Sequence, residues 1–241
     1  MKHWLPNQHG AWAFVITPVA VGAIISGFSA LHFLLLLGWL SAYCFNFYIG
    51  LTVKGWRRAD RWQRYRSQQL VYGAVAAACA TPILFQHPQL VALAPVLLAV
   101  FASNLWFIRS KNERAWLNDF LGVVAAVLMG WLSVWLGAGE LSAHHAAIIG
   151  FVGAYFAGTV WYVKTMIREK GKSGWLLLSR AWHLGVVITA AFSMPWFLLN
   201  AVPALARSWL LPGRPLNPKQ VGYIEVGLTL LVVAAATLTS R

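Results

Sequence analysis

Long apolar stretches separated by short polar connections run through the whole sequence, and this pattern constrains the fold more than any other feature. A helix needs about 20 apolar residues to cross the hydrocarbon core of a bilayer. Only 10% of the 241 residues are charged, whereas a soluble domain carries about 25%. We therefore predict an all-α, polytopic membrane protein, in which the first apolar stretch is a retained helix because further spans follow it.

The apolar stretches predict about nine transmembrane helices in a single domain that covers residues 1–241. The least regular region is 175–211, which has to hold two helices in a short length. Pro203 and Arg207 interrupt the second of these helices, so an eight-helix arrangement stays open. The predicted spans are 11–29, 31–53, 69–86, 89–108, 117–137, 145–167, 175–193, 195–211 and 219–238.

Basic residues are confined to alternate connections between these spans. In the nine-helix arrangement every lysine and arginine except Arg241 lies on one face. Short cytoplasmic loops are enriched in Lys and Arg, so the N-terminus is predicted inside and the C-terminus outside. The net charge of +13 then follows from topology. We predict membrane lipids as partners and no nucleic acid, because no soluble domain carries the basic residues.

Acidic residues gather on the same predicted cytoplasmic face. A charged side chain at the centre of a bilayer costs about 2.5–3.5 kcal/mol on insertion scales, so charges that persist near spans point to a function. We expect these acids at helix ends, among the basic loops. Glu140 is the exception on the opposite face; the others are Asp60, Glu113, Asp119, Glu169 and Glu225.

Helical spacing places several polar side chains on common faces at this depth. Asn46 and Lys54 are two helical turns apart, and Arg180 and His183 are three residues apart at the start of the seventh span. The opening PNQHGAWAF adds a polar run that membrane anchoring by tryptophan does not require. We predict a cytoplasm-facing polar cavity. Its candidate binding residues are Asn7, Gln8, His9, Lys54, Asn112, Lys164, Arg168, Lys172, Arg180 and His183.

Simpler interpretations of the same residues stay open. The basic run 56–66 is typical of a loop that contacts lipid phosphates, and NERAWLND (112–119) is suited to capping a helix. Lys164 and Arg168 are long enough to extend to the membrane surface. His183 fits a buried histidine with ordinary hydrogen-bond partners. The scattered histidines towards the outer face predict no metal site.

Four segments resemble the YwiC-like family of bacterial membrane proteins, and together they extend over nearly the whole chain. The segments are PNQHGAWAF (6–14), NERAWLNDFLGV (112–123), VWYVKTMIRE (160–169) and PKQVGYIEVG (218–227). The resemblance implies a multi-pass protein of the bacterial inner (cytoplasmic) membrane.

The predicted topology is more distantly similar to that of the UbiA-type intramembrane prenyltransferases. Those enzymes have nine helices, an inside N-terminus, and two Asp-rich motifs that hold Mg²⁺ against a prenyl diphosphate. Here Asn46 stands where the first motif would begin, but Gly50 and Lys54 follow it, and the second position offers Glu169 without aspartates. The departure counts against Mg²⁺, which prefers carboxylate oxygens, and favours fixed cations as the binders of an anion.

This resemblance implies roles for the acidic and amide residues of the cavity. The implied catalytic residues are Asn46, Asp119 and Glu169. The implied metal candidates are Asp60, Glu113, Asp119 and Glu169.

The hypothesis we favour is a membrane protein that binds an anionic amphiphile, such as an isoprenoid diphosphate, in this cavity. If it is an enzyme, it is a prenyltransferase-like transferase. One alternative is a non-catalytic assembly partner whose basic loops dock an acidic protein. The other is a small-anion transporter, which the almost wholly apolar outer halves of the helices disfavour.

Overall fold

The structure is a computed structural model that describes residues 4–6, 9–55 and 59–241, with side chains except at 9, 10 and 59–61. Over these residues the regular secondary structure is helical. The α-helices are α1 (His9–Ser26), α2 (Leu31–Lys54), α3 (Ala59–Gln86), α4 (Ala94–Arg109), α5 (Trp116–Ala138), α6 (Ala143–Val163), α7 (Ser173–Ser193), α8 (Leu198–Leu210) and α9 (Pro218–Thr239). Short turns precede α4 (η1, Pro88–Leu93) and α8 (η3, Pro195–Phe197), and a π-helical turn follows α6 (η2, Lys164–Arg168).

The helix positions confirm the predicted membrane class. Within the described ranges, 7 helices are long and apolar enough to cross a bilayer. The exceptions are α1, whose described apolar part is shorter, and α8, whose 13 residues rise only about 20 Å. The second half of region 175–211 forms a separate helix, because the α7 helix ends before Met194 and Pro195 starts a new turn. The direction of insertion stays a prediction.

The chain divides into two compact units. The first comprises Met1–Gln8 and Phe28–Ala125, and the second comprises His9–Gly27 and Ala126–Arg241. The first unit therefore holds α2, α3, α4 and the start of α5. The second holds α1, the rest of α5, and α6 to α9. The single domain expected from the sequence stays a prediction.

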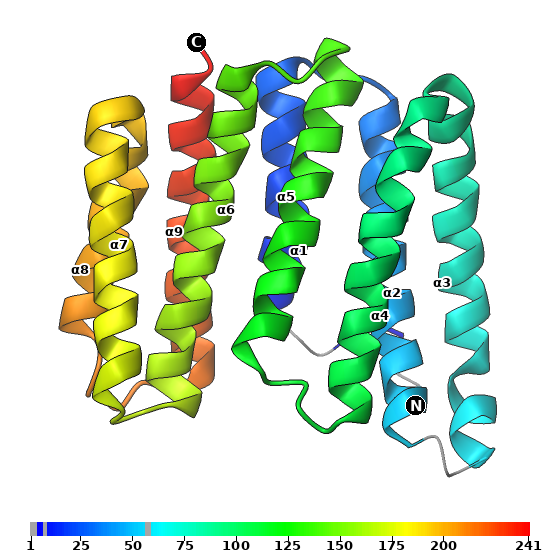
Figure 1. Ribbon diagram of the computed structural model, residues 1–241, viewed down its shortest axis with the longest axis horizontal. Helices are drawn as coiled ribbons and strands as arrows, with labels where there is room; N and C mark the ends of the chain where they lie inside the picture. The colour runs from blue at the N-terminus through cyan, green and yellow to red at the C-terminus, as the bar shows by residue number, and fades with distance from the viewer. Residues whose placement is uncertain (1–3, 7–8, 56–58) are drawn as a thin grey trace. The chain divides into compact units, whose positions relative to one another are not determined.

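In the first unit, α2 packs closely along α3, as Figure 1 shows. Small residues allow the close approach: a Cβ added to Gly38 would lie 3.0 Å from Cys79, and one added to Gly73 would lie 3.2 Å from the ring of Phe45. Phe45 also stacks on Phe101 of α4, with 6.1 Å between ring centroids. Aromatic and small side chains thus build this core.

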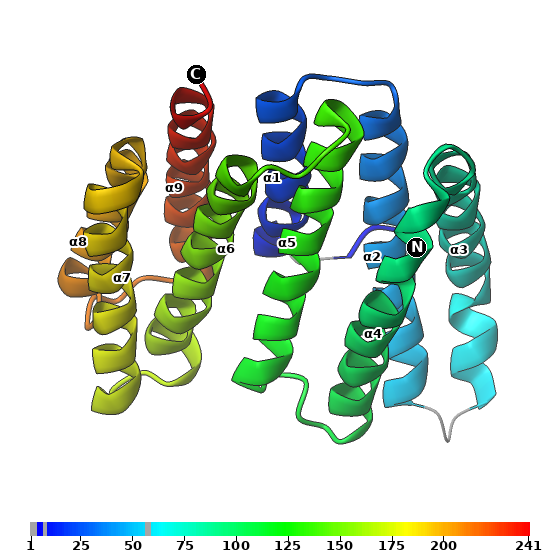
Figure 2. The same ribbon diagram turned by 45° about the horizontal axis from the view of Figure 1, so that its top comes forward.

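In the second unit, α1 packs against the later part of α5 and against α6 and α9. Ser133 on α5 donates a hydrogen bond of 2.7 Å to the carbonyl of Val19 on α1, and Gly22 is needed because an added Cβ would lie 2.6 Å from Ser133. Figures 1 and 2 show α6, α7, α8 and α9 side by side, with the α6–α7 and α8–α9 connections at the same end. These helices carry several buried polar side chains, among them His183, Arg207 and Glu225.

Candidate functional site

An arginine and a glutamate are buried together inside the second unit. Only 4% of Arg207 on α8 and 9% of Glu225 on α9 is exposed, and the Nη1 atom of the arginine pairs with Oε1 of the glutamate. A capping box between Asn217 and Gln220 fixes the start of α9. Glu225 lies seven residues after Pro218, about 10 Å along the helix, so the ion pair is well inside the helix bundle.

The second carboxylate oxygen of Glu225 is held by hydroxyl groups from α6. Thr159 donates a hydrogen bond of 2.9 Å to Oε2, and Tyr155 donates one of 3.2 Å to the same atom. Both oxygens of the carboxylate therefore have partners. This is the arrangement that a charge needs in order to persist in a low-dielectric interior.

The guanidinium group of Arg207 links α8 to α6 and α7. Its Nη2 atom donates to Thr159 Oγ1 and to His183 Nε2, each at 3.3 Å. Its carbon lies 4.3 Å from the ring centroid of Tyr162, which is within the range of a cation–π contact. We call Arg207, Glu225, His183, Tyr155 and Thr159 the buried charge centre.

His183 is held in one tautomer. Its Nε2 atom accepts from Arg207, so the proton of the neutral ring is on Nδ1, which donates to the carbonyl of Ser179 at 2.6 Å. Gly158 of α6 makes room for this ring, because an added Cβ would lie 3.0 Å from Nε2. The histidine thus has the two partners of a neutral buried ring, and its predicted role in ligand binding stays a prediction.

Further cations lie nearer the end of the same unit, where α6 joins α7. Lys164, in the π-helical turn, is only 3% exposed, and its Nζ lies 5.9 Å from the ring of Trp175. The guanidinium carbon of Arg180 lies 4.2 Å from the ring of Trp209, and its Nε donates to Ser208 O at 3.4 Å. We call this set the cationic end; its members are Lys164, Arg168, Lys172 and Arg180.

The outer members of the cationic end differ from Lys164 in their surroundings. Arg168 closes the π-helical turn and is exposed. Lys172 is exposed and pairs with Glu169 at 2.6 Å. A π-helical turn is uncommon and is often found at functional sites. Here it places one lysine inside the bundle and one arginine on its surface.

A smaller polar cluster lies in the first unit, where α4 joins α5. Lys54 pairs with Glu113 at 2.5 Å, and both are partly exposed. Asn118 accepts a hydrogen bond of 3.0 Å from Asn104 and donates one of 3.0 Å to the carbonyl of Glu113. Asp119 lies in the first turn of α5. These contacts link side chains and backbone at the connection, and both the capping and the site interpretations of NERAWLND stay predictions.

Comparison with known proteins places the chain in a family. The model of the YwiC-like protein family matches residues 5–134. The chain belongs to the YwiC-like family. It is 32% identical over 227 residues to the protein YwiC of Bacillus subtilis (strain 168), a match that covers 94% of this chain and 93% of that protein.

A second relative, from Haemophilus influenzae (strain ATCC 51907 / DSM 11121 / KW20 / Rd), is 29% identical over 242 residues, 99% of this chain and 100% of that protein. No solved structure matches the chain. The predicted membership of the YwiC-like family is confirmed, and the likeness to UbiA-type enzymes stays a prediction.

The candidate residues of this YwiC-like protein fall into both units. Asn46, Lys54, Asn112 and Asp119 belong to the first, whereas the cationic end, Glu169 and His183 belong to the second. The single cavity that would unite them therefore stays a prediction. Asn7 and Gln8 lie outside the described residues, as do the side chains of His9 and Asp60.

The carboxylates do not assemble a site suited to Mg²⁺ within the described part of the chain. Glu113 pairs with Lys54, and Glu169 pairs with Lys172. No group of three His, Cys, Asp or Glu side chains that could hold a metal occurs among the described residues. We therefore assign no metal-dependent step to these residues.

Sequence reasoning named His183 as a candidate but missed the other members of the buried charge centre. Glu225 was expected at a helix end among basic loops; instead it lies inside the unit, paired with Arg207, and this expectation is wrong. The available signal was that both charges fall inside predicted spans, where an ionisable residue is a functional candidate. Tyr155 and Thr159 carried no comparable signal, because tyrosine and threonine are common in apolar helices.

Proposed function

We propose that this YwiC-like protein is a multi-pass inner-membrane protein that binds an anionic amphiphile, with the phosphate-bearing headgroup at the cationic end of the second unit. The observation that carries the proposal is the burial of Lys164 at the end of a membrane-length helix. Basic sites between transmembrane helices at the cytoplasmic surface bind acidic lipid headgroups. A cation at the end of such a helix would lie at the level of the lipid headgroups.

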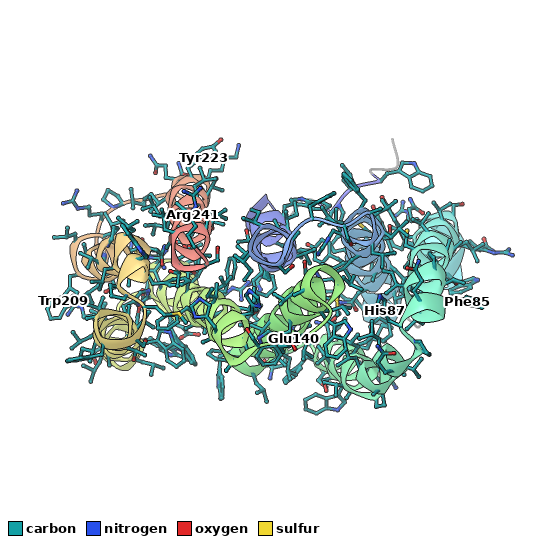
Figure 3. All side chains as sticks on the ribbon, turned by 90° about the horizontal axis from the view of Figure 1, so that it is seen from above. Phe85, His87, Glu140, Trp209, Tyr223 and Arg241 are labelled. Atoms are coloured by element: carbon teal, nitrogen blue, oxygen red, sulfur yellow. The ribbon has the colours of Figure 1, made fainter. Side chains whose placement is uncertain are left out.

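Aromatic rings support the cations of this end. Trp175 and Trp209 lie beside Lys164 and Arg180, and tryptophan is enriched at the membrane–water interface. Figure 3 shows Trp209 at the outer edge of the unit, where 57% of it is exposed. Rings beside these cations support the proposal that this end of the unit lies at the membrane interface, near phosphate oxygens.

The ligand is an amphiphile because the surface beside the cationic end is apolar. On α7, Leu177, Leu184, Ile188 and Phe192 are exposed, and their spacing places them along one face of the helix. An acyl or isoprenoid tail can lie along this face while its headgroup contacts the basic side chains. A prenyl diphosphate is the specific ligand that the likeness to UbiA-type enzymes implies, and we assign its binding rather than its chemistry.

The test is ligand retention by the intact chain in nanodiscs of phosphatidylcholine. We expect native mass spectrometry to detect added farnesyl diphosphate on the wild type. Lys164→Ala should weaken this binding about 10- to 100-fold, as for loss of a charged hydrogen bond. Arg241→Ala, at the other end of α9, is the control and should bind as the wild type does. Equal binding by Lys164→Ala and the wild type would refute the proposal.

A further inference from the structure

We propose that the connection between α4 and α5 binds the phosphate headgroup of an anionic phospholipid, with Lys111 as its central cation. This site belongs to the first unit and is separate from the cationic end, so it does not rest on the function proposed above. The connection, residues 110–115, joins two helices of membrane length, so it lies at a membrane surface whichever way the chain is inserted. Figure 1 shows it at the same end of the first unit as the end of α2.

The backbone conformation of Lys111 is the first observation. Its φ is 55°, in the left-handed region that glycine adopts readily and that a Cβ makes unfavourable. Among the described residues Lys111 is the one residue other than glycine with a positive φ. The chain places glycine at the other such positions, which are Gly27, Gly139, Gly171 and Gly213. A residue kept in a strained conformation points to a use for its side chain.

The end of α4 explains this conformation but does not explain the lysine. The backbone N–H of Lys111 donates to the carbonyl of Ile108 at 3.1 Å, and that of Asn112 donates to the carbonyl of Phe107 at 2.9 Å. These two bonds form a Schellman motif, in which the left-handed position is usually glycine. The motif uses only the backbone of residue 111, so glycine would end the helix in the same way.

The side chain of Lys111 has no ion pair that would explain it. It is exposed, and it pairs with no acid in the part of the chain that the structure describes. Glu113, two residues away, pairs with Lys54 instead. A cation at the end of a helix interacts favourably with the helix dipole, but Arg109 already supplies one in the last turn of α4. The ammonium group is therefore available to a partner outside the chain.

The charge of the connection favours an anionic partner. Arg109 and Arg114 flank Lys111 in the sequence, and both are exposed. Because Lys54 neutralises Glu113, the connection keeps an excess of positive charge. Basic residues next to a membrane helix attract anionic lipids, by about 1 kcal/mol for each lysine or arginine near the surface, which is about fivefold in affinity.

Two tryptophans place this charge at the level of lipid headgroups. Trp106, in the last turn of α4, is 61% exposed, and Trp116, at the start of α5, is 47% exposed. Tryptophan is enriched at the membrane–water interface, where its ring is buried and its N–H is hydrated. A cation between two such rings lies beside phosphodiester oxygens, which accept charge-assisted hydrogen bonds from an ammonium group. The ligand is therefore a phospholipid rather than an anion in solution.

The test is photo-cross-linking of the intact chain in phosphatidylcholine nanodiscs. The discs contain a small, non-saturating fraction of phosphatidylglycerol with a photoreactive group near its headgroup. Mass spectrometry measures the labelling of residues 106–120 separately from that of the second unit. We expect Lys111→Gln, which removes the charge, to lower the labelling of 106–120 about fivefold. Lys111→Arg, which keeps the charge, should be labelled as the wild type is.

Lys111→Gly separates lipid binding from folding. It removes both the charge and the backbone strain, so labelling should fall as in Lys111→Gln while the midpoint of thermal unfolding in dodecyl maltoside rises. A lower midpoint would show that the cation stabilises the end of α4, and it would overturn the proposal. Undiminished labelling of residues 106–120 in Lys111→Gln or in Lys111→Gly would overturn it as well.

Lys219→Gln is the control, because it removes the same charge from an exposed lysine of the second unit. It should leave the labelling of residues 106–120 unchanged, and an equal fall would show a response to net charge alone and overturn the proposal. Loss of labelling on addition of inorganic phosphate, at the concentration of the lipid, would assign the site to a free anion and overturn it too. Labelling of the second unit is measured separately, so the result is independent of whether the cationic end binds an amphiphile.

Discussion

For the buried ion pair of Arg207 and Glu225, we predict that replacing each residue alone lowers the stability by a different amount. Removing one partner of a buried ion pair costs about 3–5 kcal/mol, whereas replacing both by apolar residues is close to neutral. In Glu225→Leu the guanidinium group stays charged, because arginine does not lose its proton. Thr159 and His183 would remain as its hydrogen-bond partners, with the ring of Tyr162 beside it, but no carboxylate would balance its charge. We expect a loss near the upper limit, about 5 kcal/mol.

Arg207→Met should lower the free energy of unfolding by less than Glu225→Leu does. The carboxylate of Glu225 keeps the hydrogen bonds from Thr159 and Tyr155, and a buried carboxyl can become neutral by taking up a proton. We expect a loss near the lower limit, about 3 kcal/mol. In the double variant Tyr155 still has the carbonyl of residue 225 as an acceptor, at 3.1 Å. The free energy of unfolding of the double variant should therefore return to within about 1 kcal/mol of that of the wild type.

The assay is equilibrium unfolding in mixed micelles of sodium dodecyl sulfate and dodecyl maltoside, followed by circular dichroism. The two single variants and the double variant form a cycle that isolates the coupling between the residues. Additive losses, with the double variant less stable than either single one, would show that the two charges do not stabilise each other and would refute the reasoning.

Three further predictions concern local packing and surface contacts, each checked by unfolding in the same micelles. Gly158→Ala should lower the free energy of unfolding by about 1–3 kcal/mol, because the new Cβ would lie 3.0 Å from His183. The control is Gly150→Ala, where an added Cβ has nothing within 4 Å. Equal effects of the two substitutions would contradict the packing argument. Lys54→Ala should cost less than about 1 kcal/mol, since half of its side chain is exposed; a larger loss would show an additional role. Asn217→Ala should cost about 1 kcal/mol by removing the cap of α9, whereas Asn217→Asp should retain most of the stability.

Membrane class and helix positions could be read from the sequence because they depend on local properties. A backbone in lipid must satisfy its own hydrogen bonds, so every apolar stretch of sufficient length becomes a helix. The break between α7 and α8 was also local, since Pro195 begins a new turn. The cap at the start of α9 has a local signal too, in Asn217 and Gln220.

The partners of the polar residues depended on tertiary structure. Glu225 is 18 residues from Arg207 and 66 residues from Thr159 along the chain, and no spacing rule relates them. They meet because α8 turns back into α9, α9 packs against α6, and the Arg207 side chain reaches from α8 to Thr159 of α6. The surroundings of Lys164 and Arg168 also depended on tertiary structure. Lys164 is buried and Arg168 is exposed, although they are one helical turn apart. A charge that is costly in lipid is stabilised only by groups that other helices bring to it, and only their packing decides which groups those are.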